Sequence, residues 1–286
     1  MDETLESVQT EHGAPIDATG IINDSEPIKN SMSEPVTPLT RFFEGRADSG
    51  WSVQVVNRTD PEPMRNMLQN LFDGLSTDMS EKQLSGTDDD IVLLLRDGEV
   101  VETSPLEDLK DGLLMVNGDF YRTGTEPLEN VDPPDIIMEL SGTIFQLRGF
   151  PASDTEKLVL ILMSRYIESL ARKNGAGTLR TSFQRLSRLH DESGTWRVYQ
   201  KLGETEGLGT HVYGIPDWTP PADAGLSVHG VTAEAIKENW FVIHRQPHGS
   251  GAAMLALTTG NNEWKGFWTF DEDEIQAIDD CIQQEF

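Results

Sequence analysis

Residues 240–257 read WFVIHRQPHGSGAAMLAL, two apolar runs joined by a connection rich in Pro, Gly and Ser. Aromatic and β-branched residues on either side of such a connection are typical of an antiparallel β-hairpin. The segment GFWTF (266–270) predicts a third strand, and Glu274–Gln284 predicts an amphipathic helix because its three isoleucines recur at helical spacing. The last part of the chain therefore predicts a sheet with a closing helix packed on it.

Upstream of the hairpin, the sequence predicts helices that alternate with strands. The capping box Ser153-Asp154-Thr155-Glu156 predicts the start of a long helix, which should run to about Lys173. The glycine-rich link NGAGT (174–178) is expected to stop this helix rather than to bind phosphate, because phosphate loops follow strands. The elements expected next are two helical stretches and one strand, at Ser182–Leu189, Trp196–Leu202 and Thr210–Ile215.

The first half also interleaves helices and strands. Its expected strands are Trp51–Val56, Ile91–Leu95, Leu113–Val116 and Thr143–Leu147. Its expected helices are Pro61–Gly74 and a short one from the capping box Ser104-Pro105-Leu106-Glu107 to Lys110. The Asp97-Gly98 pair predicts a hairpin turn. The fold class is therefore α/β (or α+β), with a mixed central β-sheet flanked by helices.

Composition divides the chain into three parts. Residues 1–36 are rich in Ser, Glu, Asp, Pro and Thr, and we expect a disordered N-terminal tail there because apolar residues are few. The segment that begins at Met32 resembles the beginning of a protein. Translation can therefore start at Met1 or at Met32, and both alternatives remain open. Residues 37–149 are expected to form an N-terminal α/β region, and residues 150–286 a second domain.

The charge balance disfavours several classes of partner. The 22 Lys and Arg residues face 49 Asp and Glu, a formal charge of −27, which disfavours direct binding to nucleic acid or to anionic membranes. The acidic residues are spread along the whole chain, which favours a halophilic source whose salt screens their repulsion. An ordinary acidic protein or a mimic of an anionic polymer is the alternative. Neither a secretory signal nor an apolar span of about 20 residues is present, so a cytoplasmic protein is expected.

No residue pattern in the sequence predicts catalysis, a metal site or a cofactor. His244 and His248 have the spacing of a metal site only if both lie on a helix, and their aromatic, proline-containing context favours a strand. The one cysteine, Cys281, excludes an internal disulfide and a multi-cysteine zinc site, and its acidic neighbours raise the pKa of a thiol. Asp271 and Asp273 are expected to cap the final helix rather than to act as an acid and a base.

Basic residues concentrate in one stretch of 24 residues. They are Arg165, Arg172, Lys173, Arg180, Arg185 and Arg188. Such a local excess can bind an anionic ligand or an acidic partner surface. It can equally form internal ion pairs with nearby carboxylates, and the sequence leaves both interpretations open.

A candidate ligand site combines this basic stretch with aromatic residues near strand ends. Aromatic walls with one or two Arg or Gln side chains suit a planar, weakly anionic ligand. The alternative is that the aromatic residues simply fill the core. The candidate ligand-binding residues are Arg165, Tyr166, Phe183, Gln184, Arg188, Tyr213, Trp218 and Trp268.

A family resemblance points to a signalling role. The run SRYIESLARKNGAGTLRTSFQRLSRL (164–189) resembles the DICT sensory domain, a family named for its presence in diguanylate cyclases and two-component systems. Further similar blocks are VYQKL (198–202), HVYGIPDW (211–218), WFVIH (240–244), AAMLAL (252–257) and GFWTFDEDEIQAID (266–279). The resemblance covers about residues 150–286. LLLRDGEVVETSPLEDLKDGL (93–113) is similar to the N-terminal part of stand-alone halophilic archaeal members.

The resemblance implies a non-catalytic sensory or regulatory module of signal transduction, not an enzyme. The sequence shows no GGDEF run, no phosphoacceptor histidine helix with a glycine box and no basic DNA-reading helix. We therefore expect it to act in trans on a kinase, a cyclase or a transcription regulator. An uncharacterised small-molecule enzyme and a ligand-free interaction protein are the alternatives. A cavity of roughly 300–1,000 Å³ would favour a sensor or an enzyme over an interaction protein.

Overall fold

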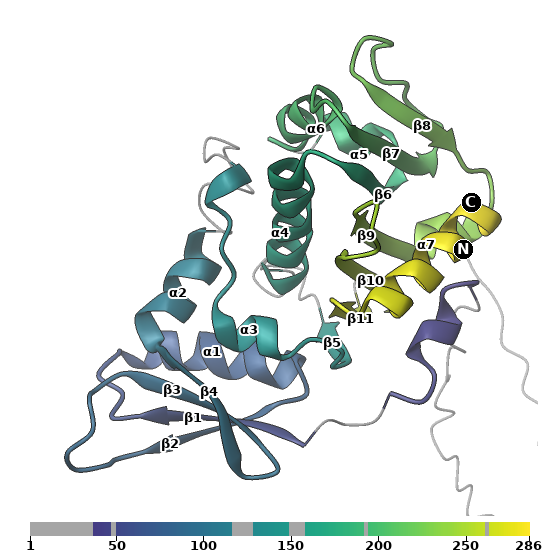
Figure 1. The fold of residues 1–286 in the computed structure, drawn as a ribbon. Coiled ribbons are helices and arrows are strands. Elements are labelled where there is room, and N and C mark those ends of the chain that lie inside the picture. Colours follow the sequence, from purple (N-terminus) through teal and green to yellow (C-terminus); the bar gives the residue numbers. More distant parts are fainter. Residues whose placement is uncertain (1–36, 47–49, 116–127, 149–157, 192–193, 261–262) are drawn as a thin grey trace, which may run out of the picture. The chain divides into compact units, whose positions relative to one another are not determined.

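Two β-sheets organise the computed structural model of the chain, which describes residues 37–46, 50–115, 128–148, 158–191, 194–260 and 263–286 (Figure 1). The first sheet has the strand order β2-β1-β3-β4, and the second has the order β5-β11-β10-β9-β6-β7-β8. Each sheet contains both parallel and antiparallel pairs, and helices flank them. The fold is therefore of the expected mixed α/β class.

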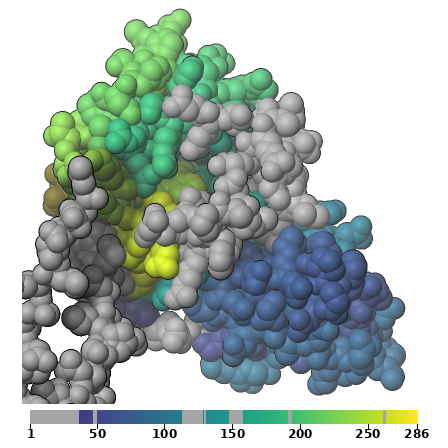
Figure 2. All heavy atoms as spheres, turned by 180° about the vertical axis from the view of Figure 1, so that it is seen from behind, coloured from purple at the N-terminus to yellow at the C-terminus, as the bar shows by residue number. Residues whose placement is uncertain are grey.

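The first sheet is built from residues 51–105. Its strands are β1 (Trp51–Val56), β2 (Asp78–Lys82), β3 (Ile91–Arg96) and β4 (Glu99–Pro105). The helical elements that follow its strands are α1 (Glu62–Gly74), α2 (Leu106–Met115), η3 (Leu128–Asn130) and α3 (Asp135–Glu139). The expected hairpin turn is confirmed, because Asp97 and Gly98 join β3 to β4 with positive φ angles of 53° and 86°, as a type I′ turn requires. The atoms of this region, in blue, gather together in Figure 2.

The second sheet contains the expected C-terminal hairpin. Its strands are β5 (Phe145–Arg148), β6 (Gly177–Arg185), β7 (Leu208–Ile215), β8 (Leu226–Gly230), β9 (Asn239–Arg245), β10 (Gly251–Gly260) and β11 (Glu263–Thr269). Strands β9, β10 and β11 pair antiparallel, which confirms the hairpin and the third strand. Strands β6, β7 and β8 pair parallel, and the crossover from β6 to β7 carries two helices.

Different elements cover the two faces of this sheet (Figure 1). The helical elements of this half are α4 (Leu158–Asn174), α5 (Ser187–Asp191), α6 (Thr195–Gly203), η5 (Glu234–Glu238) and α7 (Glu272–Glu285), and η1 (Thr40–Phe43) comes from the N-terminal side. On β9, Val242 packs in the core cluster that contains the α4 residues, whereas its neighbour Ile243 packs in the cluster of α7. Because side chains alternate along a strand, one strand supplies both cores. Phe43 of η1 completes the second core with an edge contact to Phe267, 5.1 Å between ring centroids.

Local helix signals hold at the start of α7 and at the end of α4. The Asp271 side chain accepts a hydrogen bond of 2.9 Å from the Glu274 amide, so the expected cap of α7 is confirmed. Helix α4 ends at Asn174, and Gly175 has a φ of 61°, the left-handed conformation that favours glycine after a helix. The link at 174–178 thus stops the helix, as expected.

Two expected elements are wrong. Leu113–Val116 was expected as a strand, but α2 continues through Met115. A short apolar run cannot be assigned to a helix or a strand by periodicity alone. Ser182–Leu189 was expected as a helix, but its first residues complete β6, and helix α5 begins only at Ser187. Strand β6 pairs with β7 on one side and β9 on the other, and this pairing overrides the helical spacing of the apolar residues.

Several expectations fall partly or wholly outside the described residues. They are the tail at 1–36, the capping box at 153–156 and the domain boundary at 150. Strand β5, which precedes that boundary, pairs with β11 of the C-terminal half. None of the helices in the described part of the chain is long and apolar enough to cross a membrane.

Candidate functional site

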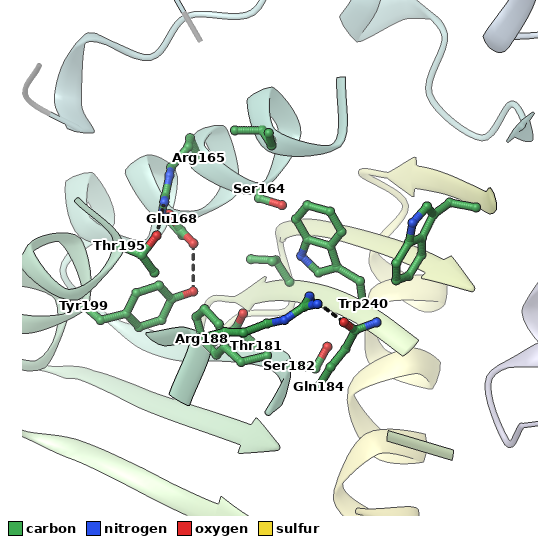
Figure 3. A pocket seen from close by; sticks show the side chains of 14 residues that line it. Ser164, Arg165, Glu168, Thr181, Ser182, Gln184, Arg188, Thr195, Tyr199 and Trp240 are labelled. Carbon is green, nitrogen blue, oxygen red and sulfur yellow. Dashed lines mark hydrogen bonds and ion pairs between the residues drawn. The ribbon is translucent and has the colours of Figure 1, made fainter. Parts of the chain in front are cut away.

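A cavity of about 100 Å³ opens on the α4 side of the second sheet (Figure 3). Side chains from α4, β6, α5 and α6 line it, together with residues of β9 and β11. These elements come from residues 158–269, so the cavity lies entirely within the C-terminal half of the chain. It lies where β6 leaves its regular pairing with β7.

A buried polar network forms one side of the cavity. Arg165 and Glu168 lie one turn apart on α4 and form an ion pair of 2.6 Å. The second Arg165 terminal nitrogen donates to the Thr195 hydroxyl of α6 over 2.8 Å. The Tyr199 hydroxyl donates to the other Glu168 oxygen over 2.7 Å. The network joins α4 to α6 and uses both oxygens of the carboxylate.

The Tyr199 hydroxyl acts in this network as a hydrogen-bond donor. The side chain is fully buried, and this burial, followed by the nearby Glu168 charge, raises the pKa of Tyr199 well above its ordinary value of 10. The phenol therefore keeps its proton at neutral pH. The Tyr199 ring also meets the Phe183 ring edge to face, with centroids 5.0 Å apart.

Gln184 holds an unusual backbone conformation at the mouth of the cavity. Its φ is 53°, and the β6–β7 register shifts between Ser182 and Arg185. A residue other than glycine pays about 1–3 kcal/mol for such strain, and strained residues of this kind cluster at functional sites. The bulge places the Gln184 amide between two partners: its nitrogen donates to the Lys237 carbonyl over 2.7 Å, and its oxygen accepts from Arg188 over 2.5 Å.

Aromatic side chains supply the apolar walls. Trp240 of β9 and Trp264 of β11 meet edge to face, with centroids 6.0 Å apart. Both line the cavity, and Figure 3 shows the Trp240 ring opposite the side chains of α4 and α6. Ser182 lies beside them, but its hydroxyl already donates to the Asn239 carbonyl and accepts from the Phe241 amide.

Four of the eight candidate ligand residues come together in this cavity. They are Arg165, Phe183, Gln184 and Arg188. The other four do not line it. Tyr166 faces away and packs on Phe270, because neighbouring residues of a helix point about 100° apart. Trp218 packs against Trp196 and His190. Tyr213 and Trp268 are core residues, 2% and 1% exposed.

Sequence reasoning missed five of the lining residues that matter most here. They are Glu168, Thr195, Tyr199, Trp240 and Trp264. The i,i+3 spacing of Arg165 and Glu168 was a visible signal for an ion pair. Nothing local indicated that Trp240 and Trp264 share one wall, because they lie on different strands that meet only through β10.

Half of the basic stretch forms ion pairs with carboxylates of the described residues. Arg165 pairs with Glu168, Arg180 with Asp279 at 2.6 Å, and Arg185 with Asp217 at 3.4 Å. Of the six basic residues, Arg165 and Arg188 line the cavity. Ion pairs are therefore shown for three of the six residues, two of which are buried, and Arg188 is an exposed cation at the cavity.

A second polar cluster lies on the α7 side of the sheet. Arg180 of β6 donates to Asp279 of α7 and, over 3.1 Å, to the Tyr213 hydroxyl. The Tyr213 ring stacks on His229 at 4.3 Å, and His229 bonds His211 at 3.0 Å between ring nitrogens. Burial, the Arg180 charge and then His229 lower the pKa of His211 to about 4.

The histidine and the cysteine that the sequence analysis considered for metal binding or reactivity, His244 and Cys281, are both buried. His244 lies on a strand, is fully buried and has both ring nitrogens bonded, to the Asn174 side chain and to the Thr178 carbonyl. Burial is also the main cause that raises the pKa of Cys281. Within the described residues, no group of three or more His, Cys, Asp or Glu side chains could hold a metal ion.

Comparisons with known proteins add little to this geometry. No protein-family model matches the chain, and no curated protein matches it, so the resemblance to the DICT family stays a prediction. The solved polyphosphate kinase from Porphyromonas gingivalis matches 85% of the chain at 9% identity with a TM-score of 0.29, and the match covers 46% of that protein. A similarity of this size carries no argument about fold or function.

Proposed function

We propose that the chain is a non-catalytic sensory module that binds a small molecule in the cavity and reports it in trans to a signalling protein. The observation that carries the proposal is the strained Gln184 at the cavity mouth. A strained backbone conformation persists only where the contacts around it hold it in place. Here the strained residue places its amide, and the Arg188 guanidinium bonded to it, against a cavity rather than a packed core.

The same residue links the cavity to another part of the molecule. Gln184 bonds the Lys237 carbonyl in η5, and the next strand begins at Asn239. The buried Asn239 amide accepts from the Thr37 hydroxyl over 3.2 Å, on the N-terminal segment that packs beside α7. A ligand that moves Gln184 would therefore act on η5 and, through Asn239, on the opposite face of the sheet.

The two alternative functions have less support. An enzyme would need a reactive group in the cavity, and both Glu168 oxygens are already bonded to Arg165 and Tyr199. The cavity of about 100 Å³ lies below the range of roughly 300–1,000 Å³ that would favour a sensor by size, so the argument against a ligand-free interaction protein is the strained Gln184 in the cavity lining. The cavity is smaller than the usual range for drug-sized ligands, so the signal molecule would be small. We place the module in the cytoplasm of a halophile, with a kinase, a cyclase or a transcription regulator as its partner.

Partner capture in molar KCl tests the proposal. The chain is used as bait in an extract of the source cells, once complete and once dialysed to remove small molecules. We expect the captured signalling protein to differ in amount between the two extracts, and Trp240→Ala to abolish that difference. Trp218→Ala is the matched control, since Trp218 is a half-buried tryptophan outside the cavity. Capture that does not depend on small molecules or on Trp240, or no capture of a signalling protein, contradicts the proposal.

A further inference from the structure

The polar groups inside the cavity leave little for a ligand to bind. Arg165 and Glu168 neutralise one another, and Thr195 and Tyr199 donate to or accept from the same pair. Ser182 is bonded to two backbone groups of β9. A ligand that entered this interior with its own charge would find no unpaired opposite charge, and an unpaired buried charge is costly.

Arg188 at the mouth is different. Its side chain is exposed. Within the described residues it makes one hydrogen bond, from a terminal nitrogen to the Gln184 side-chain oxygen. A guanidinium has five N–H donors in a planar fork that matches a carboxylate. The nearest basic residue along the chain, Arg185, pairs with Asp217 and does not line the cavity. One exposed guanidinium suits one negative charge, whereas a phosphate dianion would call for more.

The walls and the volume define the rest of the ligand. Phe183, Trp240 and Trp264 present aromatic surface, and Ile161 and Val242 add aliphatic surface. An apolar cavity of about 150 Å³ holds a benzene ring. A hollow of about 100 Å³ whose lining includes the exposed Arg188 therefore suits one planar ring with its substituent at Arg188, and it is small for nucleotides and for sugars of several rings.

We infer that the ligand is a single-ring aromatic carboxylate, with the ring between the aromatic walls and the carboxylate on Arg188. This inference rests on the proposed function for the use of the cavity, but it concerns ligand chemistry alone. The Arg188 guanidinium donates to Gln184 in the structure. A carboxylate bound to the same guanidinium would compete with Gln184, so ligand binding would alter a contact of the strained residue.

Benzoate is the probe, with benzamide as its uncharged isostere and acetate as the carboxylate without a ring. Binding to the whole chain in molar KCl is followed by titration calorimetry and by tryptophan fluorescence, since two of the six tryptophans line the cavity. We expect saturable benzoate binding. Benzamide should bind more weakly by about tenfold or more, because it lacks the charge-assisted contact. Acetate should also bind more weakly, because it has no ring to bury between the aromatic walls.

Substitution of Arg188 then tests the assigned contact. Arg188→Met should abolish the preference for benzoate over benzamide, and Arg188→Lys should retain part of it because it keeps the charge without the fork. Arg185→Met is the matched control and should keep the full preference. Arg188 is exposed, and a melting curve checks that each variant folds.

Three results would overturn the inference: no benzoate binding, equal binding of benzoate and benzamide, or an unchanged preference in Arg188→Met. The outcome is separable from that of the proposed function. Benzoate binding through Arg188 without any effect on partner capture would keep the ligand class and reject the sensory role. Small-molecule-dependent capture without benzoate binding would do the reverse.

Discussion

Arg165 and Glu168 form an ion pair of 2.6 Å across one turn of α4, with side chains that are 9% and 3% exposed. Glu234 and Lys237 of η5 form an ion pair with the same i,i+3 spacing and the same 2.6 Å distance, but their side chains are 80% and 34% exposed. The two pairs share their spacing and length and differ in residue type and in burial. Substituting each glutamate therefore compares how much a buried ion pair and an exposed ion pair contribute to the free energy of unfolding.

Glu168→Ala should destabilise the fold by about 3–5 kcal/mol, because it leaves Arg165 buried without its counter-ion and Tyr199 without its acceptor. Urea denaturation measures the free energy of unfolding. The control Glu234→Ala should cost less than about 1 kcal/mol, as exposed pairs do. Similar losses in the two variants would mean that the α4 network contributes no more than a surface pair.

Replacing Gln184 should show the backbone strain directly. With a φ of 53°, Gln184→Gly should be more stable than Gln184→Ala by about 1 kcal/mol, since both lose the side-chain bonds but glycine alone tolerates this conformation. The order should reverse at Gln276, in the interior of α7, where alanine is favoured over glycine. An alanine variant at 184 as stable as the glycine variant would show that the strain is absent.

His211 should make the fold sensitive to mild acid. The groups that face it are Arg180, His229 and Asp279, and its pKa of about 4 lies below the 6.5 of an unfolded histidine. Between these values the unfolded chain binds more protons, so stability that is present above about pH 6.5 is lost as the pH falls towards 4. His211→Gln should therefore show a shallower loss of stability between about pH 6.5 and 5.

Chemical denaturation at several pH values measures this slope. The exposed His248 provides the control, and His248→Gln should leave the slope as it is in the unchanged chain. Equal slopes in all three proteins would remove His211 as a source of the acid sensitivity.

Salt should stabilise the protein beyond the range of simple screening. The formal charge is −27, and repulsion between surface carboxylates is largely screened by about 0.2 M salt. A halophilic protein should gain further stability up to about 3 M KCl through stronger burial of apolar surface. Thermal melts at about 0.2, 1 and 3 M KCl measure this, and a constant melting temperature above about 0.2 M would contradict the halophilic interpretation.

Elements with local chemical signals could be predicted from the sequence. The β9–β10 hairpin, the Asp97-Gly98 turn and the cap of α7 each depend on residues within a few positions of one another. Turn residues and caps act on the backbone next to them, so the sequence alone determined these elements. The charge and the aromatic and basic content of the candidate site were equally visible.

Tertiary structure decided what depends on distant partners. The segment Ser182–Leu189 has apolar residues at helical spacing, but the pairing of Ser182 and Arg185 with β7 makes its first part a strand and produces the bulge at Gln184. The cavity follows from the same cause: Arg165, Arg188 and Trp240 meet through three elements, whereas Tyr166 and Tyr213 turn to other surroundings. Side-chain direction depends on how helices and strands pack, and that packing is set by contacts between residues far apart in the chain, which composition and local periodicity do not contain.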